Sequence, residues 1–257
     1  PLKNVWIFLI AVKLPLMNMD LKLYTGKSKD AMLKASLIKP SIILWIACII
    51  GSLAILPYLL TLQSLSFSNF SLGTYLIQNI LIYAFACIVG NFFAKKAKLS
   101  IYVKNQYWVL PALGGGILAG ALLVFFQFIV FPQSSVTHPS WTLGLLASLY
   151  GAINEEVLIR LLLMSSVVWC IQKITRSTQE STYWIAIIVT TLLFGAGHLP
   201  AAFKVLGDTY AVMIQILLLN GIAGVVFGYL FWRYNLMAAM LAHFVADIII
   251  HVLILLF

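Results

Sequence analysis

Acidic residues are scarce in this chain, and residues 31–154 contain none. The 257 residues include 7 Asp or Glu and 16 Lys or Arg, so that charged residues make up 9% of the sequence. In a typical soluble domain, charged residues make up about a quarter of the sequence. Hydrophobic residues make up 63%. This composition excludes a water-soluble domain. The net charge is +9, and the basic residues responsible for it lie between apolar runs, where they set membrane topology. They therefore give no indication of a nucleic-acid partner.

The chain also lacks the patterns of several known catalytic and metal sites. Its three cysteines, Cys48, Cys87 and Cys170, form no C-x-x-C pair, and we interpret them as small packing residues. There is no H-E-x-x-H pair for zinc and no G-x-S-x-G serine elbow. No two Asp residues lie within the apolar runs. These absences leave the H-E-x-x-H zinc, serine and aspartyl types of intramembrane protease without support in the sequence.

Long apolar runs dominate what is present. A run of about 20 residues crosses the hydrocarbon core of a bilayer as a helix. Seven runs reach this length: 41–62, 72–93, 108–131, 141–171, 183–203, 210–232 and 236–257. We therefore predict an all-α, polytopic membrane bundle of seven transmembrane helices. The run from Val5 to Leu16 is shorter and contains Lys13, so it is either an interfacial segment or an eighth span.

The charges of the connecting segments alternate along the chain. Segment 13–39 carries six Lys and segment 94–107 carries four, whereas 63–71 and 132–140 carry no charge. By the positive-inside rule, residues 1–40 form a cytoplasmic or interfacial segment and the C-terminus points outward. We expect residues 41–257 to form one transmembrane bundle. Its short loops fit a bacterial inner membrane, our preferred location, and equally an organelle membrane.

Charged residues first enter an apolar run at Glu155 and Glu156. A charge near the centre of a transmembrane helix costs roughly 2.5–3.5 kcal/mol on insertion scales, so it usually marks a pathway, a pair or a reaction site. Arg160 follows Glu156 by four residues, on the same helix face, where the two can pair. Glu155 points about 100° away and has no local partner. It is therefore our candidate proton acceptor.

Two later runs carry the remaining intramembrane polar candidates. His198 ends the sequence FGAGH at 194–198, and His243 begins HFVAD at 243–247. His243 and Asp247 share a helix face, where an Asp can fix the tautomer of an imidazole. His251 follows one turn later without a motif of its own, and we assign it no catalytic role. Each residue alone could bridge helices structurally, but together they indicate a site.

These residues resemble the motifs of one known family. Residues 155–160 (EEVLIR) are similar to its E-E-x-x-x-R motif, 194–198 to F-x-x-x-H, and 243–247 to H-x-x-x-N/D, in the same order. The family is the CPBP family of CAAX-type and bacteriocin-processing (Abi-like) intramembrane peptidases. The resemblance covers the C-terminal half, with an expected catalytic core at 141–257. It implies an endopeptidase acting on a peptide or membrane-protein substrate in lipid, prenylated in some members.

The resemblance also implies roles for the motif residues. Glu155 and His198 would hold and activate a water, Glu156 with Arg160 would brace the site, and His243 would face the developing oxyanion. Asp247 departs from members with Asn. An ionised Asp cannot donate a hydrogen bond, so we expect Asp247 to orient His243.

The cofactor requirement stays open at this point. One Glu and two His also make a catalytic zinc set, which here would be Glu155, His198 and His243. We favour a metal-free site because the two histidines come from separate helices without ligand spacing.

Helix geometry raises a difficulty for His198. Counted at ~1.5 Å per residue from the cytoplasmic ends, His243 lies roughly 10 Å deep and Glu155 somewhat deeper, whereas His198 lies ~22 Å from Tyr183. We therefore predict an irregular or loosely packed helix around Gly195 and Gly197, which would bring His198 to the others.

Two other function classes compete with the peptidase. An ion- or proton-coupled transporter would spread such residues over several depths and over inverted repeats. A non-catalytic CPBP-like scaffold or regulator would be marked by the loss of a motif residue. Here the polar residues cluster in one half of the chain and every motif residue is present, so we favour the peptidase.

Overall fold

The structure of the protein is a computed structural model that describes residues 29–63, 70–131 and 139–256. Within these ranges the chain forms helices and no strand. Contacts between Cα atoms divide the chain into residues 1–36 and residues 37–257, and the second unit contains the transmembrane bundle. The predicted interfacial segment from Val5 to Leu16, and with it the option of an eighth span, lies outside the described residues.

Seven helices in the described part of the chain are long and apolar enough to cross a membrane, which confirms the predicted all-α polytopic bundle. One of them, 141–175, is built from two α-helices and the π-helical turns between them, and π turns also extend α4 and α9. The α-helices are α2 (Lys29–Leu62), α3 (Leu72–Lys96), α4 (Val109–Phe125), α5 (Trp141–Tyr150), α6 (Ser165–Thr175), α7 (Glu180–Leu206), α8 (Tyr210–Arg233) and α9 (Leu236–Ile248).

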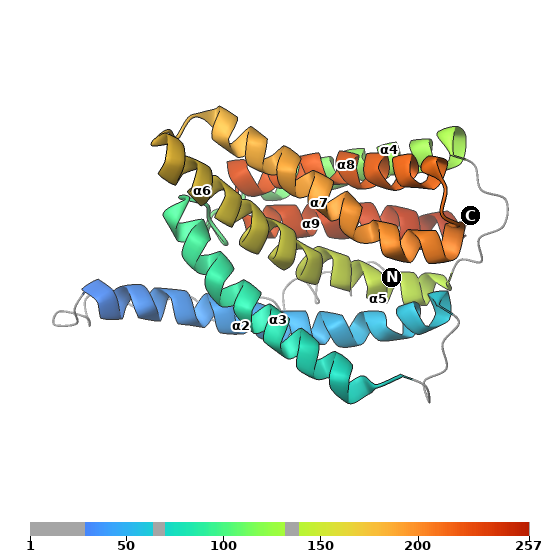
Figure 1. The fold of residues 1–257 in the computed structure, drawn as a ribbon, viewed down its shortest axis with the longest axis horizontal. Helices are drawn as coiled ribbons and strands as arrows, with labels where there is room; N and C mark the ends of the chain where they lie inside the picture. Colours follow the sequence, from blue (N-terminus) through green and yellow to red (C-terminus); the bar gives the residue numbers. More distant parts are fainter. Residues whose placement is uncertain (1–28, 64–69, 132–138, 257) are drawn as a thin grey trace. The chain divides into compact units, whose positions relative to one another are not determined.

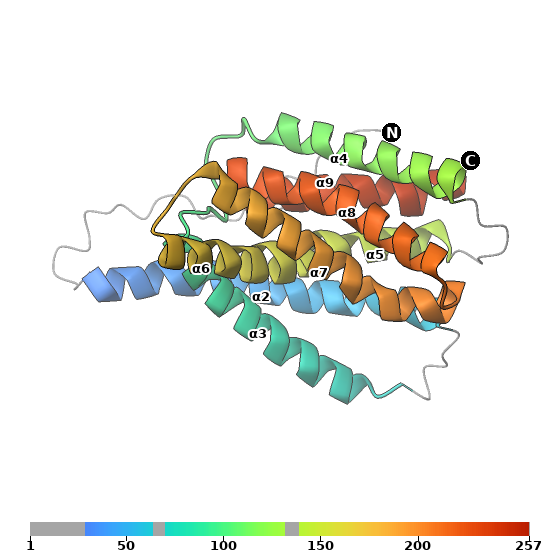
Figure 2. The ribbon, with the colours of Figure 1, turned by 45° about the horizontal axis from the view of Figure 1, so that its top comes forward.

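The helix 141–175 lies inside the bundle, between α2 and α9 (Figures 1 and 2). On one side, Asn154 donates hydrogen bonds to the Cys48 carbonyl and the Ser52 hydroxyl of α2, at 2.8 and 2.9 Å. On the other side, α9 packs against both α5 and the π turn that follows it, and α4 and α8 cover the far side of α9. This arrangement places the first and third motifs on neighbouring helices.

A close approach between backbones sets the spacing of α4 and α9. A Cβ at Gly116 would lie 2.6 Å from the carbonyl oxygen of Ala242 and 2.7 Å from Cβ of Val245. Only a residue without a side chain fits there, as expected for small residues at helix interfaces in lipid. Gly114, on the same helix, faces open space.

The cysteines differ in their surroundings. Cys48 of α2 and Cys87 of α3 are fully buried, as packing residues should be. The Ser41 hydroxyl of α2 donates to the Cys87 carbonyl at 3.1 Å and helps to join the two helices. Cys170 of α6 is exposed, so its interpretation as a packing residue is wrong.

The helix around Gly195 and Gly197 is not irregular, so that part of the prediction is wrong, whereas loose packing is found at Gly197, where a Cβ would meet open space. Helix α7 remains α-helical from Glu180 to Leu206. It runs obliquely across α9 (Figures 1 and 2), and its 27 residues span about 40 Å, more than the ~30 Å of a hydrocarbon core. Counting depth from a common starting plane therefore misplaced His198, because helices of unequal length and tilt do not start at one level.

The Gly116 contact yields a stability prediction with a matched control. We expect Gly116→Ala to lower the free energy of unfolding by about 1–3 kcal/mol, because backbone atoms of α9 must move to admit the methyl group. Gly114→Ala adds the same methyl group at an open position and should stay within about 0.5 kcal/mol of the wild type. Thermal unfolding in detergent measures both, and equal melting temperatures for the two variants would contradict the packing described.

Candidate active site

Glu156 is the buried centre of the site. Its side chain is fully buried, and its Oε1 lies 3.1 Å from the Arg160 guanidinium and 2.7 Å from Nδ1 of His243. Arg160, also buried, donates a hydrogen bond to the Gly224 carbonyl of α8 at 3.2 Å. The predicted pair of Glu156 with Arg160 is therefore present, and it connects the helix 141–175 with α8 and α9.

Aromatic rings enclose this charged group. The Arg160 guanidinium lies 5.3 Å from the ring centre of Phe194 and 5.6 Å from that of Phe227, within the range of cation–π attraction. Phe227 also stacks on the His243 ring, with 4.6 Å between centroids. The rings exclude water from the ion pair and fix the plane of the imidazole.

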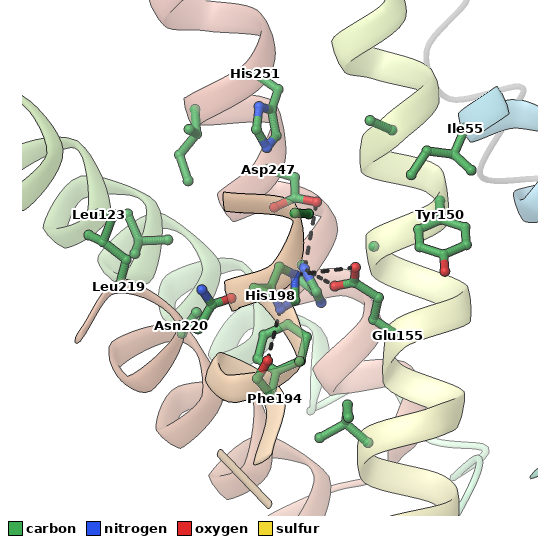
Figure 3. A pocket seen from close by; sticks show the side chains of 18 of the residues that line it. Ile55, Leu123, Tyr150, Glu155, Phe194, His198, Leu219, Asn220, Asp247 and His251 are labelled. Carbon is green, nitrogen blue, oxygen red and sulfur yellow. Dashed lines mark hydrogen bonds and ion pairs between the residues drawn. The ribbon is translucent and has the colours of Figure 1, made fainter. Parts of the chain in front are cut away.

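Glu155 points the other way, into a cavity. Its Oε1 lies 3.7 Å from Nε2 of His198, and its Oε2 lies 3.7 Å from Nε2 of His243. These separations exceed a direct hydrogen bond, and each is short enough for one water to bridge. Figure 3 shows Glu155 and His198 facing each other from different helices. Residues from all three motifs therefore meet at one carboxylate.

The two histidines present the same ring nitrogen to Glu155 for different reasons. Nδ1 of His198 lies 2.8 Å from the carbonyl oxygen of Phe194, one turn earlier on α7. A carbonyl only accepts, so this nitrogen carries the proton and, in the neutral ring, Nε2 keeps its lone pair for the cavity. Nδ1 of His243 is held by the Glu156 carboxylate. In both rings a contact at Nδ1 therefore orients Nε2 toward Glu155.

The cavity has a volume of about 670 Å³, within the usual range for ligand-binding pockets. Apolar side chains of α2, α4, α7 and α8 form most of its wall. Its polar lining includes Tyr150, Asn220 and His251 besides the motif residues (Figure 3). An apolar space with a few convergent polar groups suits a peptide segment that carries hydrophobic side chains.

Asp247 approaches His243 from the cavity side. Its Oδ2 lies 3.6 Å from Nε2 of His243, whereas the orienting contact at Nδ1 comes from Glu156. Gly151 makes this approach possible, because a Cβ there would lie 2.5 Å from Oδ2 of Asp247. His251 lines the same cavity, and its ring packs edge-on against Tyr58 at 6.0 Å.

The π turns next to the two glutamates left no signal in the sequence. They run over Gly151–Glu155 and Val157–Met164, on both sides of Glu156. Such turns widen a helix locally and occur frequently at functional sites. Asn154 anchors the first turn to α2 through the hydrogen bonds to Cys48 and Ser52. Its signal in the sequence, an amide inside an apolar run beside the glutamates, was available and was overlooked.

The structure also bears on the zinc alternative. Glu155, His198 and His243 do come together, with Nε2 of each imidazole 3.7 Å from an oxygen of the Glu155 carboxylate. Over residues 29–63, 70–131 and 139–256, no three His, Cys, Asp or Glu side chains are arranged so as to hold a metal ion.

Part of the chain is similar to a known protein family. Residues 137–249 match the family described as type II CAAX prenyl endopeptidase Rce1-like. We call these residues the Rce1-like segment. The match confirms the resemblance to the CPBP family. No curated protein and no solved structure matches the chain.

The Rce1-like segment contains all three motifs and the whole Glu156 network. The family is a protease family, which supports a protease, and the apolar helices make the chain an integral, multi-pass membrane protein. Helices α2 to α4 precede the segment, yet α2 and α4 supply cavity wall, so the site is completed by residues outside the match.

The buried network predicts that stability and activity separate at Glu156. We expect Glu156→Gln to lower the free energy of unfolding by about 3–5 kcal/mol, because Arg160 is left as a buried charge without its partner. Adding Arg160→Met removes that charge and should recover most of the stability.

Peptidase activity should not return in the double variant, because His243 still lacks the carboxylate at Nδ1. Thermal unfolding and peptide cleavage, measured on the same detergent preparations, test this. Recovery of activity together with stability would show that Glu156 has a packing role alone.

Proposed function

We propose that this protein is an intramembrane endopeptidase that hydrolyses a peptide bond with a water held by Glu155 and His198. The observation that carries the proposal is the convergence of Glu155 with Nε2 of His198 and of His243 in one cavity. Hydrolysis inside a bilayer needs a nucleophilic water, a base and a donor for the tetrahedral oxygen. The cavity offers a candidate for each.

In the proposed reaction the water bridges Glu155 and Nε2 of His198. Its oxygen attacks the carbonyl carbon of the scissile bond while one of its protons passes to the Glu155 carboxylate. The protonated Glu155 then gives that proton to the leaving nitrogen as the C–N bond breaks. A carboxylic acid and an amine leave the site, and Glu155 returns to its starting state.

His243 is the proposed donor to the developing oxyanion. Its Nδ1–H is taken by Glu156, and the carboxylates of Glu155 and Asp247 both lie near Nε2. Ionised carboxylates only accept, so they favour a proton on Nε2, the ring nitrogen on the cavity side, from which the substrate oxygen could accept a hydrogen bond. Asp247 supports the charged ring and does not contact the oxyanion. This arrangement is metal-free, and Glu155 acts as the base.

The proposed substrate is a membrane-anchored peptide or a membrane-protein tail. The apolar cavity wall supports this class, and the family's description as a CAAX prenyl endopeptidase makes prenylated C-terminal peptides part of the test panel. A bacterial inner membrane is the proposed location, and the short connections between helices are compatible with it as they are with an organelle membrane.

The first test of the proposal is cleavage of a fluorogenic peptide panel by the purified protein. Glu155→Gln and His198→Ala should each lower kcat by about 10²–10⁴-fold, the contribution of a positioned acid–base group. Glu180→Gln is the matched control, because Glu180 is exposed and pairs with Arg233 at a helix end. It should cleave like the wild type.

Gel filtration shows whether the variants remain folded. Folded wild-type protein that cleaves no peptide of the panel would favour the non-catalytic scaffold.

The second test is metal removal. Turnover should survive dialysis against a strong zinc chelator, because in the proposed reaction the water is held by Glu155 and His198. Metal content is measured on the same sample. If activity falls with the zinc content and returns when zinc is added, the Glu155-base mechanism is wrong and the zinc alternative replaces it.

A further inference from the structure

The two ends of the bundle differ in charge, and contacts show which loops share an end. The backbone N–H of Leu236 donates to the Ser100 carbonyl at 2.9 Å, and Arg233 pairs with Glu180 at 3.1 Å. The connections 97–108, 176–179 and 234–235 therefore lie together. At or next to them the chain carries Lys95, Lys96, Lys98, Lys104, Lys173, Arg176 and Arg233.

The opposite connections are nearly free of positive charge. Segments 63–71 and 132–140 contain no Lys or Arg, and 204–209 contains only Lys204. Lys and Arg in short loops mark the cytoplasmic side of a membrane protein. The end of the bundle that carries the basic residues is therefore the cytoplasmic end.

The cavity extends toward the other end. Its wall includes Leu62, the last residue of α2, and Gln127 in the π turn that follows α4. Ala201, near the end of α7, and His251, in the π turn beyond α9, also line it. Ala201 is exposed, and His198 is 38% exposed. Among the residues that the structure describes, the cavity is thus open where α2, α4 and α7 end.

Toward the basic end the interior is closed. Met164, Ile187, Phe231 and Leu236 are all fully buried there, and none of them lines the cavity. A peptide arriving at the cytoplasmic face would meet this packed end, with the Glu156 network between it and the cavity.

From these observations we infer that the catalytic cavity opens to the non-cytoplasmic side and takes a membrane-anchored peptide whose scissile segment lies on that side of the membrane. The inference rests on the proposed function for its substrate. Its geometric part, the side on which the cavity opens, stands on the loop charges and the cavity lining alone. It disfavours tails that are anchored and processed at the cytoplasmic face.

Cysteine labelling in vesicles of known orientation tests the opening without any turnover. The background carries Cys170→Ser, because Cys170 is exposed, and retains the fully buried Cys48 and Cys87. Single cysteines are added as Lys104→Cys at the basic end, Asp208→Cys at the other end, and Ala201→Cys or Asn220→Cys in the cavity. The probe is a membrane-impermeant maleimide.

We expect Asp208→Cys and both cavity variants to be labelled in right-side-out vesicles, and Lys104→Cys only in inside-out vesicles. Labelling of the cavity cysteines only from the side that labels Lys104→Cys would overturn the inference. So would labelling of Asp208→Cys from the cytoplasmic side, or two folded cavity variants that label from neither side, because hydrolysis requires water in the cavity.

An activity measurement then tests the substrate class. A membrane-impermeant fluorogenic peptide added to sealed right-side-out vesicles should be cleaved without permeabilisation. Cleavage confined to inside-out vesicles would overturn the inference while leaving the peptidase proposal standing. Because labelling needs no turnover, failure of the peptidase proposal and failure of the cavity's sidedness give different results.

Discussion

The fully buried carboxylate of Glu156 is the constraint on which the site depends. A lone charge in the interior of a transmembrane bundle is strongly unfavourable, so Glu156 requires Arg160 and a second donor, and His243 supplies it. The contacts of Oε1 of this carboxylate connect the helix 141–175 with α9, and Arg160 extends the connection to the Gly224 carbonyl of α8. The orientation of His243 toward the cavity follows from this folding requirement.

Two neighbouring glutamates thereby acquire different tasks. Glu156 is fully buried and neutralised by permanent partners, whereas Glu155 is 22% exposed and faces two imidazole nitrogens at 3.7 Å. A carboxylate that already has short hydrogen bonds is a poor base for a substrate water, and one that faces a cavity at bridging distance is available. Neighbouring residues of a helix point about 100° apart, which separates the two side chains, and π turns flank Glu156 on both sides.

The sequence predicted the transmembrane helices better than the depth of the site residues in the membrane. Strong apolar runs made the seven spans recognisable, and the spacing of Glu156 and Arg160 predicted their pair, because both signals are local. The position of His198 was misjudged because tilt and unequal helix length are set by packing between helices, which no single run encodes. The π turns left no local signal. The contact of Glu156 with His243 spans 87 positions of the chain and depends on how α9 packs against 141–175.

The most direct test of Glu155 as a base is the fate of oxygen in a single turnover in water enriched in oxygen-18. With the purified protein in excess over a peptide substrate, mass spectrometry measures the label in the product and in the protein fragment that contains Glu155. The account predicts label in the new carboxylate of the product and none in Glu155. Label in Glu155 would mean that its carboxylate attacks the substrate as a nucleophile, and that result would contradict a water held and deprotonated by Glu155.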